Sequence, residues 1–342
     1  MSESPIRVGV VGAGYFAQFH LDAWSRLPGV TLAAVCDQNA ENLAPARQHY
    51  PHAQTFTHAE QMLTDAELDL VDIVTPPHTH AELVAQVSKA ALPAICQKPL
   101  APTIDEAQAI VETAESAGTL LVVHENIRFA PWHREMARLV QAGQLGQLHG
   151  VTMRLRPGDG QGPRAYLDRQ PYFQAMPRFL IHETAIHWID TFRFLVGEVT
   201  GVFARLRKLN DAIAGEDAGL VMFSFANGAD GLFDGNRLND HESDNPRRTM
   251  GEMWLEGTAG VLRLDGSARI WWKPHGELER EHPYAWTDRA FAGDAVYALQ
   301  RHVVAHLRDG GSLENTARDY LRNLDIEEAV YRSADQRCWV DL

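Results

Sequence analysis

The segment RFLIHETAIHW, residues 178–188, places His182, Glu183 and His187 within six positions. A zinc peptidase needs the pattern HExxH, in which two histidines four apart share a helix face and the Glu acts as base. Here the histidines are five apart, about 140° around a regular helix, so one ion cannot easily bind both. Glu183 and His187 are four apart and do share a face. They form either an active-site pair or an ordinary polar pair on a solvated helix, and this segment alone leaves both readings open.

A second motif has the spacing of a dinucleotide-binding turn. Residues 12–17 read G-x-G-x-x-A directly after an apolar run and at the start of a helical pattern. Gly12 would permit the tight turn, Gly14 would let a pyrophosphate approach the backbone, and Ala17 is small enough for close helix–strand packing. The N-terminus of the helix would then hold the phosphates, beside Tyr15 and Phe16.

Asp37 ends the next apolar run, about 20 residues further on, where a carboxylate binds the ribose 2′-hydroxyl group of NAD. This carboxylate would repel a 2′-phosphate, and Gln38 rather than an arginine follows it. The sequence therefore favours NAD over NADP. The alternative is a surface aspartate after a strand.

The first half of the chain alternates strand-like and helix-like runs. Strands that are nearly all apolar indicate burial on both faces, and their alternation with helices is typical of a doubly wound parallel sheet. We therefore expect an NAD-binding Rossmann domain over residues 1–126. Thr103, with Glu106 three residues on, predicts a capped helix start. The expected strands are residues 6–14, 30–37, 68–77, 93–96 and 119–126, and the expected helices are 15–27, 58–65, 78–91 and 103–118.

The second half, residues 127–342, alternates apolar and polar residues between Gly, Asn and Asp turns. This pattern predicts an α+β domain with a large open, mostly antiparallel sheet, whose last strand or helix could pack back on the first domain. Open sheets need cover, so we expect a homodimer or homotetramer formed through this sheet. The expected strands are residues 150–156, 201–209, 218–226, 229–238, 251–257 and 268–274, and the expected helices are about 179–196, 290–308 and 315–335.

Composition restricts the class of protein. The 342 residues are 45% hydrophobic and 22% charged, with a net charge of −14 and no basic stripe, which argues against nucleic acid as a partner. No apolar run approaches the ~20 residues of a membrane span, and no signal peptide is evident. Three cysteines at unrelated spacings fit a reduced, cytoplasmic protein.

Taken together, these motifs resemble the Gfo/Idh/MocA oxidoreductase family, which includes glucose–fructose oxidoreductase and inositol dehydrogenase. The resemblance covers essentially the whole chain. It implies a Rossmann domain, a C-terminal α/β domain with an open sheet, and NAD-dependent oxidation of a CH–OH group. It rests on VGVVGAGYFAQFH, VTPPHTHAELV, CQKPLAPTIDEAQ, VVHENIRFAP, the helix that carries Glu183 and His187, and LRNLDIEEAVYRSA.

The resemblance implies three catalytic residues. The family motif E-K-P is here Gln97-Lys98-Pro99, which keeps the lysine and replaces the acidic residue with a neutral group beside the nicotinamide ribose. The family helix D-x-x-x-H corresponds to Glu183 and His187. Lysine and histidine side chains are both used as general bases in enzymes, so either Lys98 or His187 can accept the hydroxyl proton. Glu183 can orient His187 or bind a neighbouring hydroxyl group. The sequence leaves open which residue is the base.

The segment TPPHTH is expected to line the cofactor, unless its prolines only form a turn. The expected residues are Thr75, Pro76, Pro77 and His80.

Several residues suggest an anionic substrate such as a sugar acid. Arginine forks suit carboxylates, although each arginine can equally be a surface residue. Glu125 and Asn126 end the last expected Rossmann strand and, with His182, could also contact the substrate. The candidate arginines are Arg128, Arg156, Arg164 and Arg178.

Glu125, His182 and Glu183 form a candidate Mg2+ site, because carboxylates and substrate oxygens commonly bind this ion. The alternative for His182 is a core histidine bonded to a carbonyl group. The segments RPGDGQGP, FLIHET and FDGNRLNDH are similar to the branch of the family that contains D-apionate oxidoisomerase, which couples oxidation of a branched sugar acid to rearrangement, a step that Mg2+ could assist. The alternatives are a simple sugar or inositol dehydrogenase, an NAD-dependent glycoside hydrolase, and a catalytically silent NAD-binding regulator.

Overall fold

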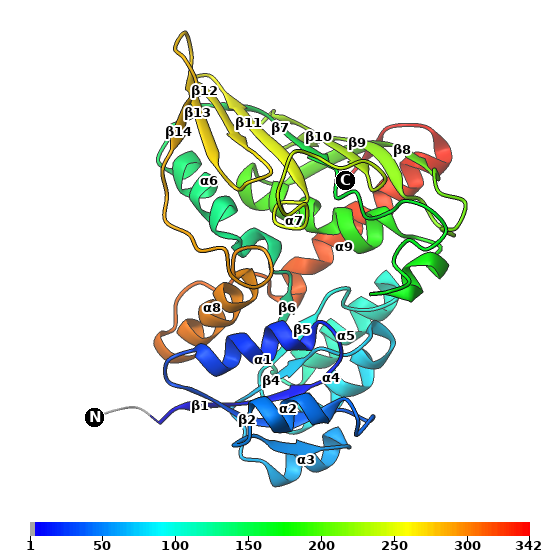
Figure 1. The fold of residues 1–342 in the computed structure, drawn as a ribbon, viewed down its shortest axis with the longest axis vertical. Coiled ribbons are helices and arrows are strands. Elements are labelled where there is room, and N and C mark those ends of the chain that lie inside the picture. Colours follow the sequence, from blue (N-terminus) through cyan, green and yellow to red (C-terminus); the bar gives the residue numbers. More distant parts are fainter. Residues whose placement is uncertain (1–3) are drawn as a thin grey trace. The chain divides into compact units, whose positions relative to one another are not determined.

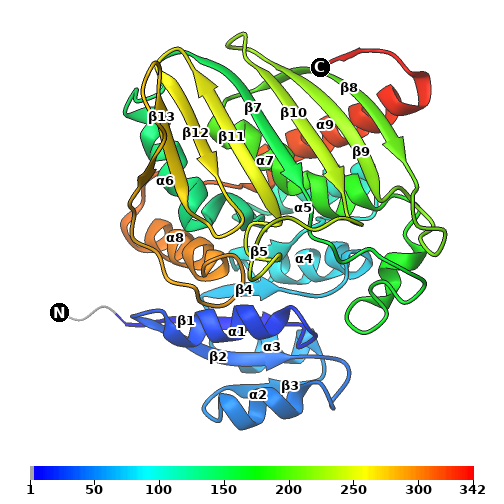
Figure 2. The same ribbon diagram turned by 45° about the horizontal axis from the view of Figure 1, so that its top comes forward.

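The computed structural model describes residues 4–342 and divides into two compact units. Unit 1 comprises Met1–Asn126 and Asp294–Arg322, and unit 2 comprises Ile127–Gly293 and Asn323–Leu342. In the described residues, unit 1 contains a six-stranded sheet and unit 2 a nine-stranded sheet (Figures 1 and 2). The α/β class expected from the sequence is confirmed.

The sheet of unit 1 has the strand order β3-β2-β1-β4-β5-β6, and every neighbouring pair is parallel. This strand order is that of a doubly wound fold, in which helices cover both faces of the sheet. Burial on both faces explains why the strand sequences are nearly all apolar. The five expected strands are present, and the short β3 was not expected. The strands are β1 (Ile6–Val11), β2 (Val30–Cys36), β3 (Gln54–Phe56), β4 (Leu70–Ile73), β5 (Ala94–Gln97) and β6 (Leu121–His124).

The helices of unit 1 begin close to the expected positions. Thr103 caps α5 through its hydroxyl oxygen, which accepts a hydrogen bond from Glu106 N at 3.3 Å, as its sequence context predicts. The helix α2 was not expected from the sequence. The helices are α1 (Ala17–Arg26), α2 (Leu43–His49), α3 (Ala59–Asp65), η1 (Pro77–Thr79), α4 (His80–Lys89), α5 (Ile104–Ser116) and α8 (Ala295–Asp309).

Helix α8 belongs to unit 1, although the division at residue 127 assigns it to the second domain. It packs on α1, where Arg26 donates to both carboxylate oxygens of Asp294, at 2.6 and 2.8 Å. The apolar face of α8, with Val296, Leu299 and Val303, is buried. A long-range packing contact of this kind leaves no local signal in the sequence.

The sheet of unit 2 has the order β14-β13-β12-β11-β7-β10-β9-β8-β15. All its pairs are antiparallel except β10 with β7, which are parallel. The strands are β7 (Leu148–Leu155), β8 (Val199–Arg207), β9 (Ala218–Phe225), β10 (Asp230–Asn236), β11 (Gly251–Gly257), β12 (Gly260–Leu264), β13 (Ile270–Pro274), β14 (Arg280–His282) and β15 (Val340–Asp341). Strands β12, β14 and β15 were not expected.

Helices cover one face of this sheet, with α6, α7 and most of α9 on the same side (Figure 2). Strand residues alternate between buried and exposed positions, as an open sheet requires. The helical elements are η2 (Ile127–Phe129), α6 (Pro131–Gln141), η3 (Pro171–Ala175), η4 (Leu180–Ala185), α7 (Ile186–Leu195) and α9 (Ala317–Gln336).

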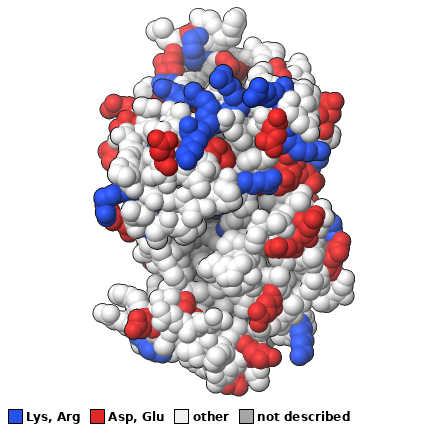
Figure 3. Space-filling view, turned by 90° about the vertical axis from the view of Figure 1, so that its right-hand side faces the viewer, with Lys and Arg blue, Asp and Glu red and all other residues white. Residues whose placement is uncertain are grey.

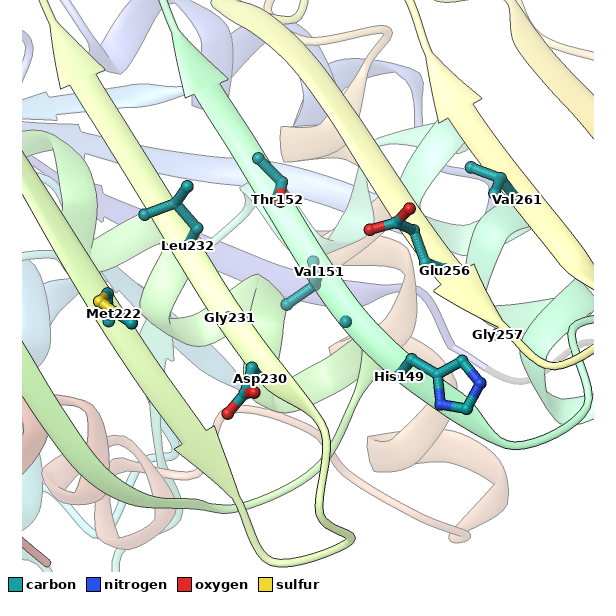
Figure 4. A pocket seen from close by; sticks show the side chains of 11 residues that line it. His149, Val151, Thr152, Met222, Asp230, Gly231, Leu232, Glu256, Gly257 and Val261 are labelled. Atoms are coloured by element: carbon teal, nitrogen blue, oxygen red, sulfur yellow. The ribbon is translucent and has the colours of Figure 1, made fainter.

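The opposite face of the sheet carries a shallow hollow of about 490 Å³ (Figure 4). Leu220 and Met222 on β9 are 43% and 51% exposed, which is unusual for large apolar side chains. The hollow is lined by residues 149–152, Met222, residues 230–232, Glu256, Gly257 and Val261. Large apolar side chains are therefore exposed on this face of the sheet.

The surface charge is unevenly distributed. On the face drawn in Figure 3, Lys and Arg side chains gather in the upper part of the view, with Asp and Glu side chains around them. The net charge of −14 therefore does not make every surface negative. Among residues 4–342, none of the helices is long and apolar enough to cross a membrane.

Candidate active site

The glycine turn lies between β1 and α1 and fits a dinucleotide. Gly12 has φ +105°, and a Cβ atom there would lie 2.6 Å from the backbone oxygen of Val74, so only glycine fits. A Cβ atom on Gly14 would meet nothing within 4 Å, which leaves open space beside the backbone. Ala17 is buried at the first position of α1. The turn therefore offers the close approach and the helix N-terminus that a pyrophosphate needs.

Asp37, directly after β2, is bonded to this turn. Its Oδ2 accepts a hydrogen bond from the backbone N–H of Ala13 at 2.8 Å. Its Oδ1 accepts from Asn39 N at 2.9 Å and from Asn42 Nδ2 at 3.1 Å. The carboxylate is thus held at the edge of the glycine turn, and its contact with a ribose stays a prediction.

Three further candidate cofactor residues, Tyr15, Phe16 and Gln38, lie in or near the same turn. Tyr15 is 45% exposed and packs edge-on against Phe19, while Phe16 contacts both Phe19 and His20. Gln38 is exposed. The side chains of Tyr15 and Gln38 are therefore accessible to solvent, whereas the ring of Phe16 packs against Phe19 and His20.

The segment Thr75-Pro76-Pro77 follows β4, and His80, the first residue of α4, is hydrogen-bonded to it. His80 is buried, with Nε2 2.8 Å from Thr75 O and Nδ1 3.0 Å from Leu100 O. Burial lowers the pKa of His80. His80 therefore links two loops through hydrogen bonds: the loop after β4 and the loop that carries Lys98.

Lys98 follows β5, and a cis peptide bond joins it to Pro99. The side-chain Oε1 of Gln97 accepts a hydrogen bond from the backbone N–H of Lys98 at 2.8 Å. Gln97 thus fixes the main chain of the lysine, a role that the sequence did not predict.

Glu125 and Asn126 end the first segment of unit 1 and are buried, at 0% and 2% exposure. Asn315 donates to the backbone oxygen of Glu125 at 2.7 Å. Nearby, the ring of His124 lies 4.1 Å from that of His20, whose Nδ1 is 2.7 Å from Asp72 Oδ2. A buried polar cluster therefore underlies α1, and the sequence analysis did not identify it.

The helix that carries Glu183 and His187 is not regular, so the prediction of one α-helix over 179–196 is wrong in its first part. Leu180–Ala185 is a π-helix, and α7 begins at Ile186. A π-helix closes i→i+5 hydrogen bonds, so the angle of about 140° that holds for a regular helix does not apply across this segment. π-Helical turns frequently occur at functional sites.

Glu216, from the loop between β8 and β9, caps this irregular start. Its Oε1 accepts hydrogen bonds from Phe179 N and Ile181 N, both at 3.1 Å, and from the hydroxyl group of Tyr331 at 2.7 Å. An anionic acceptor at helix N–H groups is stabilising. This contact between residues distant in the sequence anchors the segment that carries Glu183.

Glu183 is bound by Arg237, which the sequence analysis missed. Oε2 of Glu183 accepts from Thr184 Oγ1 at 2.7 Å and from Arg237 Nη1 at 3.4 Å. Arg237 also donates to both oxygens of Asp159, at 3.2 and 2.8 Å. Burial opposes the charge of Arg237, but the nearby carboxylates and Tyr166 raise its pKa above the ordinary value. The partners are 54 and 78 residues away in sequence, so local spacing could not reveal them.

His182 and His187 differ in their surroundings. Nδ1 of His182 lies 2.7 Å from Glu327 Oε1, and its backbone N–H donates to Tyr331. This contact differs from the carbonyl bond of the alternative reading. His187 is 8% exposed, and its backbone oxygen accepts from Thr191 at 2.8 Å.

Each candidate substrate arginine has a carboxylate partner. Arg128 forms a two-pronged pair with buried Asp190, at 2.5 and 2.6 Å. These pairs weaken the case for a substrate carboxylate, because the charge of each arginine is already balanced. The remaining pairs are Arg156 with Asp234 at 2.6 Å, the exposed Arg164 with Asp168 at 2.9 Å, and Arg178 with Glu328.

Among residues 4–342, no group of three His, Cys, Asp or Glu side chains could hold a metal ion. His182 and Glu183 are engaged with Glu327 and Arg237. The ligand set Glu125, His182 and Glu183 therefore has no preformed centre among the described residues and stays a prediction.

The parallel sheet, the glycine turn and Asp37 define a dinucleotide-binding oxidoreductase fold. The family model "Oxidoreductase family, NAD-binding Rossmann fold" matches residues 6–125, and "GFO/IDH/MocA C-terminal domain" matches residues 133–263. The chain therefore belongs to the Gfo/Idh/MocA family, and NAD is its cofactor.

Named relatives and solved structures match almost the whole chain. It is 32% identical over 341 residues to D-apiose dehydrogenase of Paraburkholderia graminis, covering 97% of this chain and 88% of the relative. It is 28% identical to D-apiose dehydrogenase of Rhizobium rhizogenes, covering 100% and 99%. An oxidoreductase from Agrobacterium radiobacter, solved in complex with NAD+, L-tartaric acid and magnesium, is 27% identical with a TM-score of 0.88, over 98% of both chains.

Proposed function

We propose that this chain is an NAD-dependent dehydrogenase that oxidises a CH–OH group of a small sugar, with D-apiose as the first candidate. The observation that carries the proposal is the whole-length similarity to two relatives named D-apiose dehydrogenase. The balanced charges of Arg128, Arg156, Arg164 and Arg178 support a neutral substrate over an anionic one.

The cofactor residues have assigned tasks in this proposal. Gly12, Gly14 and Ala17 receive the pyrophosphate, and Asp37 binds the ribose hydroxyl groups. Tyr15, Phe16 and Gln38 border the adenosine half. Thr75, Pro76, Pro77 and Gln97 border the nicotinamide half, with His80 holding their loops. When bound, NAD+ supplies the acceptor for the hydride that leaves the substrate carbon.

The proton of the substrate hydroxyl group needs a separate acceptor. Lys98 and His187 are the candidates, and Glu183 orients His187 or accepts a hydrogen bond from a neighbouring hydroxyl group. The C–H bond breaks as the hydride leaves, the O–H proton passes to the base, and a carbonyl group remains. Glu125, Asn126 and His182 stay candidates for contacts with the other hydroxyl groups.

A second candidate is a sugar acid processed with Mg2+, as in an oxidoisomerase that acts on D-apionate. The observation that favours it is the similar Agrobacterium radiobacter structure, which contains L-tartaric acid and magnesium. In this version the ion is recruited together with the substrate oxygens, since Mg2+ is rarely bound by protein ligands alone.

Nicotinamide absorbance distinguishes these candidates. The protein is incubated with NAD+ and D-apiose, D-apionate, an inositol or an aldose, each with Mg2+ or with EDTA. The proposal predicts NADH from D-apiose regardless of EDTA. NADH from D-apionate alone, abolished by EDTA, would favour the second candidate. Cleavage of a glycoside with no net NADH would instead indicate a hydrolase.

We also propose that the chain acts in the cytoplasm and self-associates through the open face of its nine-stranded sheet. All three cysteines are free, which suits a reducing compartment. The exposed Leu220 and Met222 beside the hollow provide apolar surface that a second copy would cover.

A further inference from the structure

Arg237 is a buried cation held by aromatic rings. It is 4% exposed and follows β10, where its Cζ lies 5.0 Å from the ring centroid of Tyr166 and 4.9 Å from that of Phe179. A third ring, that of Phe173, lies at 5.7 Å. These rings form a small separate core with Ala165 and Ile213. Rings around a guanidinium group fix its plane and exclude water.

The guanidinium group of Arg237 contacts both the loop of residues 156–179 and the π-helix η4. On one side Asp159, in the loop of residues 156–179, accepts from Nε and Nη2. On the other side Nη1 donates to Thr184 Oγ1 at 2.5 Å and to Glu183 Oε2 at 3.4 Å. A planar, forked donor transmits orientation between its partners better than a flexible ammonium group.

The loop is also tied to the backbone of Arg237. Gly160 N donates to the carbonyl oxygen of Arg237 at 2.9 Å, and Arg169 donates to the same Asp159 carboxylate at 3.2 Å. A Cβ atom on Gly160 would lie 3.1 Å from that carbonyl oxygen, so the two segments are in close contact. Arg237 therefore contacts both loop 156–179 and the Glu183 carboxylate.

We propose that Arg237 is a positioning residue for the reaction: together with Asp159 it sets the direction of the Glu183 carboxylate and makes that direction depend on loop 156–179. This inference rests on the proposed function only for its kinetic consequence. Its structural content is that the Glu183 carboxylate turns away when Arg237 is removed. Arg237 acts through Glu183 and does not itself react.

The test compares Arg237→Met, Asp159→Asn and Glu183→Gln, with the double variant Arg237→Met/Glu183→Gln. Arg248→Met is the matched control, because Arg248 is also buried, pairs with Asp244 and Asp288, and lies over the ring of Trp286. Thermal unfolding and the Kd for NAD+ are measured for each variant. Crystal structures of the wild type and Arg237→Met are compared at Glu183.

Arg237→Met is expected to lower kcat about 10- to 100-fold while the Kd for NAD+ stays within about threefold, because misplaced catalytic groups cost rate. Asp159→Asn is expected to give a smaller loss, and Arg248→Met to change kcat less than about threefold. In the Glu183→Gln background the loss caused by Arg237→Met should nearly vanish, since the two residues act as one unit. Equal losses in both backgrounds would mean a merely structural role and would overturn the inference.

The crystal structures decide the matter independently of turnover. A displaced Glu183 carboxylate in Arg237→Met, with an unchanged turn at residues 12–17, supports the inference. An unmoved carboxylate overturns it. If the wild-type protein oxidises none of the sugars, the proposed function fails, while this structural comparison still tests the role of Arg237.

Discussion

Asp37 Oδ2 accepts a hydrogen bond from the backbone N–H of Ala13 at 2.8 Å, so the residue directly after β2 also fixes the glycine turn after β1. In the proposed dinucleotide site, this hydrogen bond joins the candidate phosphate turn to the candidate ribose carboxylate. Preorganisation of this kind lowers the entropic cost of binding.

Removing this carboxylate should weaken NAD binding. In Asp37→Ala the turn loses an anchor and the ribose loses its acceptor, so we expect the Kd for NAD+ to rise about tenfold or more. The ratio of the Kd for NADP+ to the Kd for NAD+ should decrease as well, because Asp37 no longer repels a 2′-phosphate. Titration calorimetry with both nucleotides measures this, with the exposed Glu67→Ala as control. An unchanged Kd would exclude Asp37 as the ribose ligand.

His80 should be required both for stability and for the placement of Lys98. In His80→Ala the contacts to Thr75 O and Leu100 O are lost, which should lower the free energy of unfolding by about 1–3 kcal/mol. The loop of Lys98 loosens, so kcat should fall too. Urea unfolding and steady-state kinetics test this, with the exposed His78→Ala as matched control. Equal effects of the two substitutions would refute the role of His80 as a link between the two loops.

His133 in α6 should make the protein less stable in acid. Burial lowers the pKa of His133 to about 4, whereas an unfolded histidine has a pKa near 6.5. Between these values the unfolded chain binds a proton that the native state excludes, so the free energy of unfolding falls as the pH drops from about 6.5 to 4. The contribution is about 3 kcal/mol in total and vanishes above this range.

Urea unfolding at pH 7.5 and pH 5 measures this dependence. The variant His133→Asn should lose less stability on acidification than the wild type does, while His52→Asn, at an exposed position, should behave like the wild type. An identical pH dependence in His133→Asn would show that another group is responsible.

A charge on the open sheet face should disrupt self-association. Met222 is 51% exposed beside the hollow, and an aspartate there would be buried without a partner in an assembly. Light scattering after gel filtration should give an oligomer for the wild type and a smaller species for Met222→Asp. Leu278→Asp, at a position that is 89% exposed in the turn between β13 and β14, is the control. A monomeric wild type would rule out this interface.

The sequence predicted what depends on local patterns. The glycine turn and Thr103 as helix cap are each fixed by residues close together in the chain, and the structure shows both. The alternation of strands and helices likewise predicted the parallel sheet. Helix α8 lies close to the residues expected for it, but the domain boundary at residue 127 separated it from unit 1, because its place on α1 depends on packing and on an ion pair between Arg26 and Asp294.

The contacts around the helical segment of residues 180–195 could not be predicted from local sequence patterns. Its π-helical start is capped by Glu216, more than 30 residues later, and spacing rules assume a regular helix. Arg237, which follows β10, lies beside Glu183 in a fold in which β10 pairs with β7 and β9. The candidate arginines were chosen by charge and by their positions in the sequence, whereas their carboxylate partners, such as Asp190 for Arg128, become evident only in three dimensions.

The most direct test of the account is NADH formation from NAD+ and D-apiose by the wild type and by Lys98→Met, with Lys89→Met as a control at an exposed lysine. We predict NADH from the wild type and the control, and a loss of kcat of at least about 100-fold in Lys98→Met, with NAD+ still bound. Full activity of Lys98→Met, or a wild type that reduces no NAD+ with any small sugar, would contradict the account.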